Sequence, residues 1–290
     1  MISISRQQIK SKKHRSRNLF NYAVSVLVIL FVFLPIYIML DTSFQSETEA
    51  NLAEFHWFPK QFSVLGYVSV FTKQLAGISI IRGLFNTLWI YLPGVIVGVY
   101  MSSLSAFAFA KIRFKAKKFM FSVMLSTIML PNSMSTIAQV LLYDSLGWMN
   151  TPWPLMIPPM FGSISAVFFM RQFYLTIPED LVSAAKIDGL GYFGIYNKII
   201  FQMSGSVLIA QFLLNFISSY NDYMRPLLFC QSSSMYTLQV TLAMFAGPYA
   251  QNWPLRMAGC VVGMTPLILL YVFSQKFIRK GLEISSSIKG

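Results

Sequence analysis

The sequence predicts an all-α integral membrane protein with six transmembrane helices and a short cytoplasmic helix-turn-helix between the fourth and fifth. Of the 290 residues, 55% are hydrophobic and only 11% are charged, whereas soluble domains carry about 25% charged residues. A helical crossing needs roughly 20 mainly apolar residues. Six runs of this kind occur, at about 20–40, 84–108, 119–141, 154–170, 202–221 and 257–275.

The first crossing follows a basic arm, residues 1–19, that carries six Lys and Arg residues. Such charges orient the crossing that follows them, because Lys and Arg are retained on the cytoplasmic side. With a pI near 9.8, nucleic-acid binding is the alternative for the arm. The apolar run is too long for a removable signal peptide and lacks its small-residue cleavage pattern, so we expect an uncleaved anchor.

The positive charges also predict the orientation of the whole chain. Six crossings place both termini on one side of the membrane, and 18 of the 23 Lys and Arg residues fall in the segments on that side. The positive-inside rule therefore predicts cytoplasmic N- and C-termini. The link 111–118, with five positive charges, is expected to act only in fixing this topology.

The segments between the crossings differ in character. Residues 41–80 form a polar and aromatic outside segment that is too long for a tight turn. Its Trp57, Phe58 and Tyr67 suit an interfacial aromatic belt, with a partner-docking surface as the alternative. The fourth crossing opens among several prolines, which a helix bundle tolerates because neighbouring helices satisfy the freed backbone groups.

The stretch LVSAAKIDGLGYFGIYNKII, residues 181–200, predicts two short helices separated by a turn. Thr176 to Glu179 fits a capping box at a helix start, and the helix is expected to run to about Ile187. Gly189 and Gly191 then interrupt it, because glycine accepts a positive φ angle.

The first of these two helices is short, and its length restricts where it can lie relative to the membrane. About eleven residues span only about 16 Å, which is too short to cross a bilayer. The segment 171–203 is therefore expected on the cytoplasmic face. Ala184 and Ala185 would give the helix a flat surface for the close approach of another protein. An ordered connector between crossings is the alternative.

The residue types needed for catalysis or metal binding are sparse. The two cysteines, Cys230 and Cys260, show neither a CxxC motif nor a Cys/His ligand spacing and are expected to be packing residues. His14 and His56 lie far from any carboxylate pair, and no GxxxxGK[ST] phosphate loop is present. We predict no catalytic residue, no metal site and no cofactor in this chain.

The order Ser-Ala-Ala, three residues, Gly189, nine residues, Ile199 resembles the EAA loop of ABC importer permeases, the element through which the membrane subunit engages its ATPase. The residues Ser183, Phe201 and Gln202 depart from the usual Glu, Leu and Pro. Further stretches, MNTPWPLMIPP, FFMRQFYLTIPEDL, SYNDYMRPLL and GLEISSSIKG, resemble the sugar-transporting branch, so the likeness runs from about Phe58 to Gly290. The resemblance is to the maltose-type second permease partner.

The resemblance implies a heteromeric importer in a bacterial plasma membrane. Its membrane domain would be residues 20–278, and the tail 279–290 would reach the ATPase dimer. This chain would pair with a second permease, two ATPase subunits would bind ATP and Mg, and an external solute-binding protein would deliver a di- or oligosaccharide. ATPase coupling falls, by this likeness, to Ser183, Ala184, Ala185, Asp188 and Gly189.

Polar residues in the fifth crossing predict a pathway for the solute. Gln211, Asn215, Ser218 and Asp222 recur at spacings of four, three and four, so they share one helical face. The alternative is helix-to-helix hydrogen bonding, at about 0.6 kcal/mol each, and for Asp222 an intrahelical ion pair with Arg225. Further pathway candidates are an aromatic ring, an amide of the SYNDY motif and an amide that follows a proline of the third crossing, namely Tyr220, Asn221 and Asn132.

Other transport functions and a non-transport function are the alternatives. A secondary transporter driven by an ion gradient would need more ionisable residues at mid-membrane than Asp222 alone. Related permeases carry glycerol phosphodiesters, sugar phosphates and polyamines, but a strongly anionic solute would call for more intramembrane Arg or Lys. A membrane scaffold without transport is the third alternative.

Overall fold

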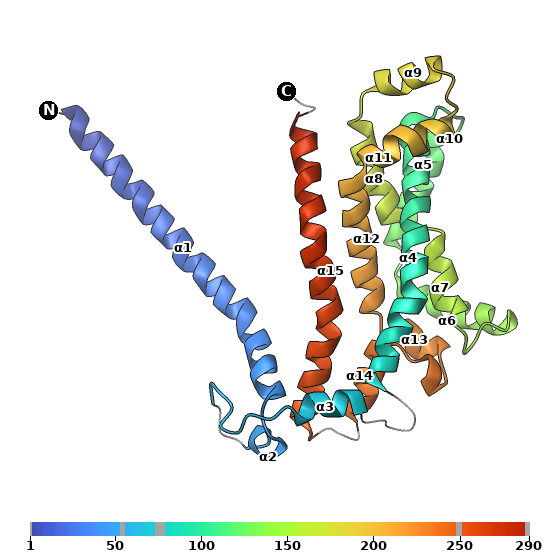
Figure 1. The fold of residues 1–290 in the computed structure, drawn as a ribbon. Helices are drawn as coiled ribbons and strands as arrows, with labels where there is room; N and C mark the ends of the chain where they lie inside the picture. The colour runs from blue at the N-terminus through green and yellow to red at the C-terminus, as the bar shows by residue number, and fades with distance from the viewer. Residues whose placement is uncertain (1, 53–55, 73–78, 248–250, 288–290) are drawn as a thin grey trace. The chain divides into compact units, whose positions relative to one another are not determined.

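The computed structural model describes residues 2–52, 56–72, 79–247 and 251–287, and every regular element in these residues is a helix (Figure 1). The predicted all-α class is therefore confirmed. The chain forms two compact units, Met1–Val70 with Tyr249–Val261, and Phe71–Pro248 with Val262–Gly290.

The helices that are long and apolar enough to cross a membrane coincide with the predicted runs. Within the described residues they are Asn21–Ser43, Ile80–Lys111, Trp153–Leu175 and Trp253–Lys276. Two helix pairs qualify only if each counts as one bent crossing: Lys117–Met129 with Met134–Ser145, bent by 100°, and Tyr192–Met203 with Gly205–Tyr220, bent by 81°. Four to six crossings follow from length and composition, so the predicted count of six is the upper value.

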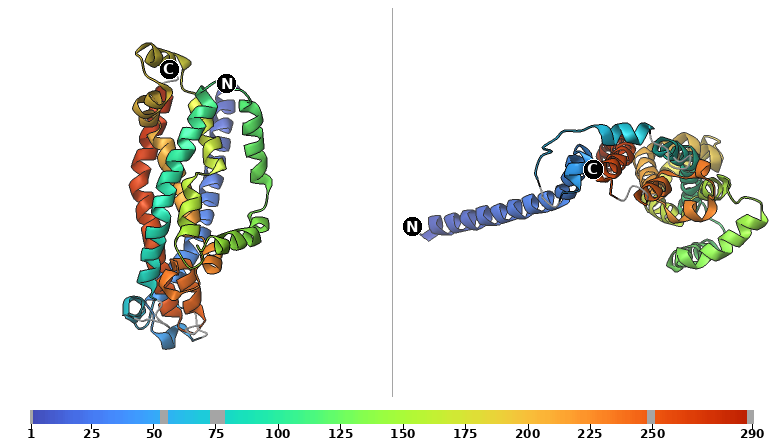
Figure 2. Two further views of the ribbon diagram at one scale, coloured as in Figure 1. Left: turned by 90° about the vertical axis from the view of Figure 1, so that its right-hand side faces the viewer. Right: turned by 90° about the horizontal axis from the view of Figure 1, so that it is seen from below.

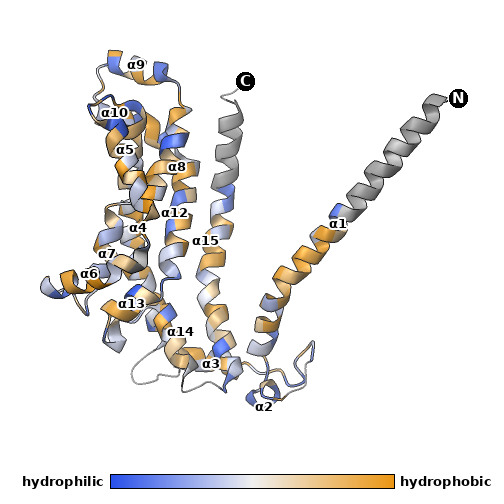
Figure 3. Cartoon of the chain, turned by 180° about the vertical axis from the view of Figure 1, so that it is seen from behind, coloured by the Kyte–Doolittle hydropathy of each residue, from blue (hydrophilic) through white to orange (hydrophobic). Residues whose placement is uncertain are grey.

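The first unit contains α1 (Ile2–Ser43), α2 (Glu47–Ala50), most of α3 (Leu65–Thr72) and the beginning of α15 (Trp253–Ser287). Hydrophobic residues dominate α1 between Asn21 and Ser43 (Figure 3), and in this unit most of their side chains are exposed, Phe31 to 81%. An apolar surface of this length suits contact with lipid or with another apolar helix.

The segment that follows α1 in the first unit is held by hydrogen bonds from backbone N–H groups to side chains. The side chain of Ser46 caps α2, and the Glu49 carboxylate accepts hydrogen bonds from the backbone N–H groups of Lys60 and Gln61, at 2.7 and 3.1 Å. Trp57 and Phe58 remain exposed, 58% and 75%. This exposure fits either the predicted aromatic belt or a docking surface.

The second unit is organised around α4 (Ile80–Lys111). The helices that pack on α4 most extensively are α7 (Trp153–Met160), α8 (Ile164–Leu175), α12 (Gly205–Tyr220) and α14 (Leu238–Ala246) (Figures 1 and 2). The other elements of this part are α5 (Lys117–Ser126), η1 (Thr127–Met129), α6 (Asn132–Ser145), α9 (Glu179–Ile187), α10 (Tyr192–Ile195), the π-helix η2 (Tyr196–Ile200), α11 (Phe201–Met203), α13 (Met224–Phe229) and η3 (Ser233–Met235).

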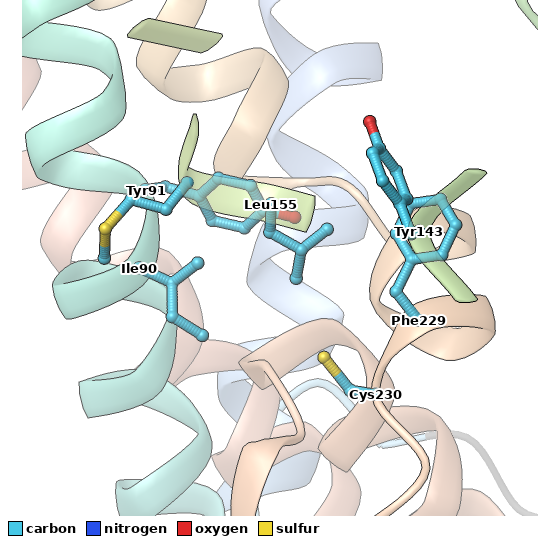
Figure 4. Packing of buried hydrophobic residues seen from close by; sticks show 7 residues of the cluster. Ile90, Tyr91, Tyr143, Leu155, Phe229 and Cys230 are labelled. Atoms are coloured by element: carbon cyan, nitrogen blue, oxygen red, sulfur yellow. The ribbon is translucent and has the colours of Figure 1, made fainter. Parts of the chain in front are cut away.

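A hydrophobic cluster joins α4, α6, α7 and the end of α13 (Figure 4). The rings of Tyr143 and Phe229 meet edge to face with centroids 5.1 Å apart. Cys230 lies in the same cluster and is 1% exposed, which fits the packing role expected for it.

The predicted capping box is wrong. The helix α9 begins at Glu179 after the extended residue Pro178, and no side chain caps it. The Thr176 hydroxyl instead donates to the Phe173 carbonyl, at 2.7 Å, at the end of α8. Because Glu179 is the first residue of its helix rather than the third, it is not in register with Thr176.

Candidate functional site

The turn after α9 has the local geometry that the glycine pattern predicts, with one correction. Gly189 has a φ of +81°, and the N–H groups of Gly189 and Leu190 donate to the carbonyls of Lys186 and Ala185, both at 3.0 Å. This pattern closes a helix on a left-handed residue. Gly191, by contrast, has a φ of −70° and precedes α10, so it needs no conformational freedom special to glycine.

The side chains of α9 divide into an inner and an outer face. Ser183, Ala184, Asp188 and Gly189 are exposed, whereas Ala185 is 3% exposed. The predicted flat surface formed by Ala184 and Ala185 together is therefore wrong, because adjacent residues point about 100° apart around a helix. Ala185 packs inward, as does Val182.

Sequence reasoning missed the most exposed apolar side chain of this segment. Ile187 is 88% exposed at the end of α9. The signal was available, since Ile187 falls off the face that Val182 and Ala185 define. A large apolar side chain left in this position suits burial by another protein surface.

Hydrogen bonds connect the C-terminal end of α4 to α8 and to the residues between α8 and α9. Lys111 Nζ donates to the Ile177 carbonyl, at 2.5 Å, and Arg171 Nε donates to the Phe109 carbonyl, at 3.0 Å. The Arg113 to Glu179 ion pair, at 3.8 Å, joins exposed side chains and adds little. Lys111 thus binds a structural carbonyl, beyond the topological role expected of this charge cluster.

A cavity of about 600 Å³ lies in the second unit between α4, the α7–α8 break and α12. Gln211, Asn215 and Ser218 all line it, as their helical spacing predicts. Gln211 is 6% exposed, and the Asn215 side-chain amide donates to the Gln211 carbonyl at 2.8 Å. The structure therefore brings together three of the predicted pathway residues.

The other predicted pathway residues do not line this cavity. The Tyr220 hydroxyl donates to the Gly263 carbonyl, at 2.7 Å, and Asn221 accepts a hydrogen bond from Gln239, at 3.3 Å. Tyr220 is a candidate because of its aromatic ring and Asn221 because of the SYNDY motif, so neither prediction rests on the helical face of the stripe. Asn132 begins α6, and its side chain lies outside the described part of the structure.

Asp222 forms the ion pair that was the alternative for it. Its Oδ2 lies 2.5 Å from Arg225 Nε and accepts a hydrogen bond from the Tyr91 hydroxyl at 3.1 Å. The pair is not intrahelical, because α12 ends at Tyr220 and α13 begins at Met224. The helix ends before the fourth member of the stripe, which is why Asp222 leaves the cavity face.

The part of the cavity wall that α4 and the α7–α8 break contribute was not predicted. Ser102 on α4 accepts a hydrogen bond from the Ser163 N–H, at 2.9 Å, where the chain breaks between α7 and α8. Gly162 in this break has a φ of +90°. The sequence signal for the break was Pro158 and Pro159 followed by a glycine.

The cavity has a mixed lining without net charge, in which apolar side chains such as Phe169 and Leu214 alternate with polar groups. Arg225 is the one cation among its lining residues, and Asp222 neutralises it. The uncharged polar lining consists of hydroxyls and amides, from Ser102, Ser163, Ser165, Gln211, Asn215, Ser218 and Ser219. Within the described residues, no group of three His, Cys, Asp or Glu side chains is arranged to hold a metal ion.

Comparisons with known proteins agree with one another. Residues 94–284 match the family described as "Binding-protein-dependent transport system inner membrane component". The chain is 28% identical over 288 residues to the arabinooligosaccharides transport system permease protein AraQ of Halalkalibacterium halodurans, covering 96% of this chain and 100% of that protein. It is 30% identical over 270 residues to the sn-glycerol-3-phosphate transport system permease protein UgpE of Brucella abortus, covering 91% and 95%.

A solved structure shares the fold. It is a crystal structure of a bacterial ABC transporter involved in the import of the acidic polysaccharide alginate. The TM-score is 0.77 at 20% identity, over 91% of this chain and 98% of the other.

Proposed function

Because this chain belongs to the family of binding-protein-dependent transport system inner membrane components, whose relatives here are permeases of ABC importers, we propose that its own solute is a neutral di- or oligosaccharide. The chain is a transport subunit and not an enzyme. The observation that carries the proposal is the cavity of about 600 Å³, whose polar lining is uncharged except for Arg225, which Asp222 neutralises.

The lining chemistry favours a sugar. Hydroxyl and amide groups can exchange hydrogen bonds with sugar hydroxyls, and a cavity of this size falls in the range of small-molecule sites. AraQ is named for arabinooligosaccharides. We assign the solute contacts on α12 to Gln211, Asn215 and Ser218.

An anionic solute is the second candidate, because UgpE is named for sn-glycerol-3-phosphate and the solved relative imports an acidic polysaccharide. An anion needs an available cation, and Arg225 is already paired with Asp222 at 2.5 Å. A positive charge for such a solute would have to come from the second permease. The lining of this chain alone favours the neutral solute.

The partners follow from the same assignment. The exposed side of α9, with Ser183, Ala184, Ile187, Asp188 and Gly189, would dock on an ATPase subunit at the cytoplasmic face. Closure of the ATPase dimer would then move the docked helix as a rigid body. A second permease would complete the pathway, two ATPases would bind ATP and Mg, and an external binding protein would deliver the solute.

The test is uptake by the complete complex in proteoliposomes. We expect uptake to require ATP and binding protein and to survive an ionophore, whereas a secondary transporter would lose uptake with the ion gradient and need no ATP. A thermal-shift screen of the binding protein against neutral sugars and glycerol phosphodiesters distinguishes the two solute classes. Stabilisation by the phosphodiesters alone would overturn the sugar assignment.

A variant pair tests the cavity itself. Asn215→Leu should reduce uptake at least several-fold without loss of assembly, because its amide lines the cavity. Gln239→Leu, whose amide meets Asn221 outside the cavity, is the matched control and should transport normally. Equal uptake by both variants would remove Asn215 from the pathway.

A further inference from the structure

Four buried hydroxyl groups lie close together where α4, α8 and the segment from the π-helix to α12 meet. They belong to Ser103 on α4, Tyr174 on α8, Tyr196 at the start of the π-helix and Ser204 between α11 and α12. Each of the four residues is 0% exposed. Buried hydroxyls have to find partners within the protein, because an unpaired one costs free energy.

Hydrogen bonds join these hydroxyls one after another. The Tyr196 hydroxyl donates to Ser103 Oγ at 2.8 Å, and Ser103 Oγ lies 2.5 Å from the Tyr174 hydroxyl. The Tyr174 hydroxyl also interacts with Ser204, and Ser204 Oγ donates to the Ile200 carbonyl. The Tyr196 hydroxyl is thus a donor to Ser103, whereas either oxygen of the Ser103–Tyr174 pair can be the donor.

Both ends of this hydroxyl chain lie on the π-helix, Tyr196–Ile200. Short π-helices occur frequently at functional sites and are common sources of helix bends. Here the π-helix precedes the 81° bend that separates Tyr192–Met203 from Gly205–Tyr220. Hydrogen bonds of the buried hydroxyls therefore connect the bent segment to α4 and α8.

Two members of the hydroxyl chain are next in sequence to elements that line the cavity. Ser103 is preceded on α4 by Ser102, which lines the cavity, and Ser204 directly precedes α12, which carries Gln211, Asn215 and Ser218. A displacement of the π-helix would therefore act on two walls of the cavity together. The aromatic contacts of Tyr196 do not depend on its hydroxyl, since its ring packs on Phe107 with centroids 5.6 Å apart.

We propose that the hydroxyl chain of Tyr196, Ser103, Tyr174 and Ser204 transmits the displacement of the α9–α10 segment to α4 and α12, so that ATP hydrolysis and solute movement stay coupled. These four are positioning residues, which act through the helices that they join. The inference rests on the proposed function, because it requires a docked ATPase.

The test is Tyr196→Phe, which keeps the ring and removes the first donor. Purified complexes with both permeases, the ATPases and the binding protein are placed in proteoliposomes, and ATP hydrolysed is measured against solute imported. We expect the ATP-to-solute ratio to rise roughly threefold, the factor that one average interhelical hydrogen bond in a membrane protein gives. Tyr236→Phe, which removes a hydroxyl bonded to the Gln231 carbonyl at 3.4 Å, should keep the wild-type ratio.

Tyr174→Phe breaks the same chain at its centre and should raise the ratio as well. The ATP-to-solute ratio of the double variant should be only slightly higher than that of the stronger single variant, because either substitution alone already interrupts the series of hydrogen bonds. A wild-type ratio in both single variants would overturn the inference. So would failure of both variants to assemble, since the hydroxyls would then serve folding only. Absence of ATP-dependent uptake by the wild-type complex would instead overturn the proposed function.

Discussion

Two glycines on α4 allow a close contact with α7 in the second unit. A Cβ atom at Gly94 would lie 2.7 Å from the Met156 carbonyl oxygen, and one at Gly98 would overlap the Pro159 carbonyl oxygen. Such small-residue contacts let helix backbones approach closely in membrane proteins. The contact positions α7 beside α4 and thereby shapes one wall of the cavity.

Gly98→Ala should therefore destabilise the protein by about 1–3 kcal/mol, because an added methyl group forces a packed backbone apart. The measurement is the melting temperature of the purified protein in detergent. Gly205→Ala is the matched control, since a Cβ atom at Gly205 would have no heavy atom within 4 Å. Equal melting temperatures for the two variants would show that the Gly98 contact is loose.

Burial controls the reactivity of the Cys230 thiol. Desolvation raises its pKa from the ordinary 9.0 to about 11, so the thiolate, which is the reactive form, is scarce at neutral pH. In a Cys260→Ser background we expect slow maleimide labelling at pH 7. A Gln231→Cys variant that also carries Cys230→Ser should label rapidly, because residue 231 is exposed.

The same pKa shift makes the stability of the folded state depend on pH. The folded state holds the thiol proton more tightly than the unfolded state does, so this group lowers stability as pH rises between about 9 and about 11. Rapid labelling of Cys230 at pH 7 would contradict its burial.

At the scale of the element, α9 and its turn depend on one backbone conformation. Gly189 has a φ of +81°, which other residues adopt only with strain, and a Cβ atom there would meet no neighbour within 4 Å. Replacement therefore changes the turn and not the packing around it.

Gly189→Val should uncouple ATP hydrolysis from uptake, because the turn that presents α9 cannot form without strain. Uptake by the reconstituted complex is the measurement. Gly191→Val is a close control: its φ is −70° and its surroundings are equally open, so valine fits. Undiminished uptake by Gly189→Val would contradict a coupling role for the turn.

At the scale of the whole molecule, the charge distribution predicts orientation in the membrane. The segments assigned to the cytoplasm carry 18 of the 23 Lys and Arg residues, and the segment around α9 is one of them. Orientation is a property of the chain in its membrane, so it is argued from the positive-inside rule.

We expect an impermeant thiol reagent to label Ile187→Cys only from the cytoplasmic side, in a background with Cys230→Ser and Cys260→Ser. Trp57→Cys should be labelled only from outside. Both parent side chains are exposed, 88% and 58%. Labelling of Ile187→Cys in intact cells would reverse the orientation and remove the ATPase-docking role of α9.

The sequence by itself determined the helical class, the positions of the apolar runs, the helix pair around Gly189 and the face shared by Gln211, Asn215 and Ser218. These features depend on composition, on local backbone preference or on helical period, all of which act over a few residues. The resemblance of the EAA-type loop added the family, which the match over residues 94–284 confirms.

Only the tertiary structure decided which helices meet. It assigned Ser102 and Ser163 to the cavity, paired Asp222 with Arg225, moved Tyr220 and Asn221 away from the cavity and buried Ala185. The hydrogen bonds of Ser103 with Tyr174 and Tyr196 likewise join positions 71 and 93 residues apart. The physical reason is that contacts between distant segments depend on how helices pack, and helical period specifies a face of one helix without specifying its neighbour.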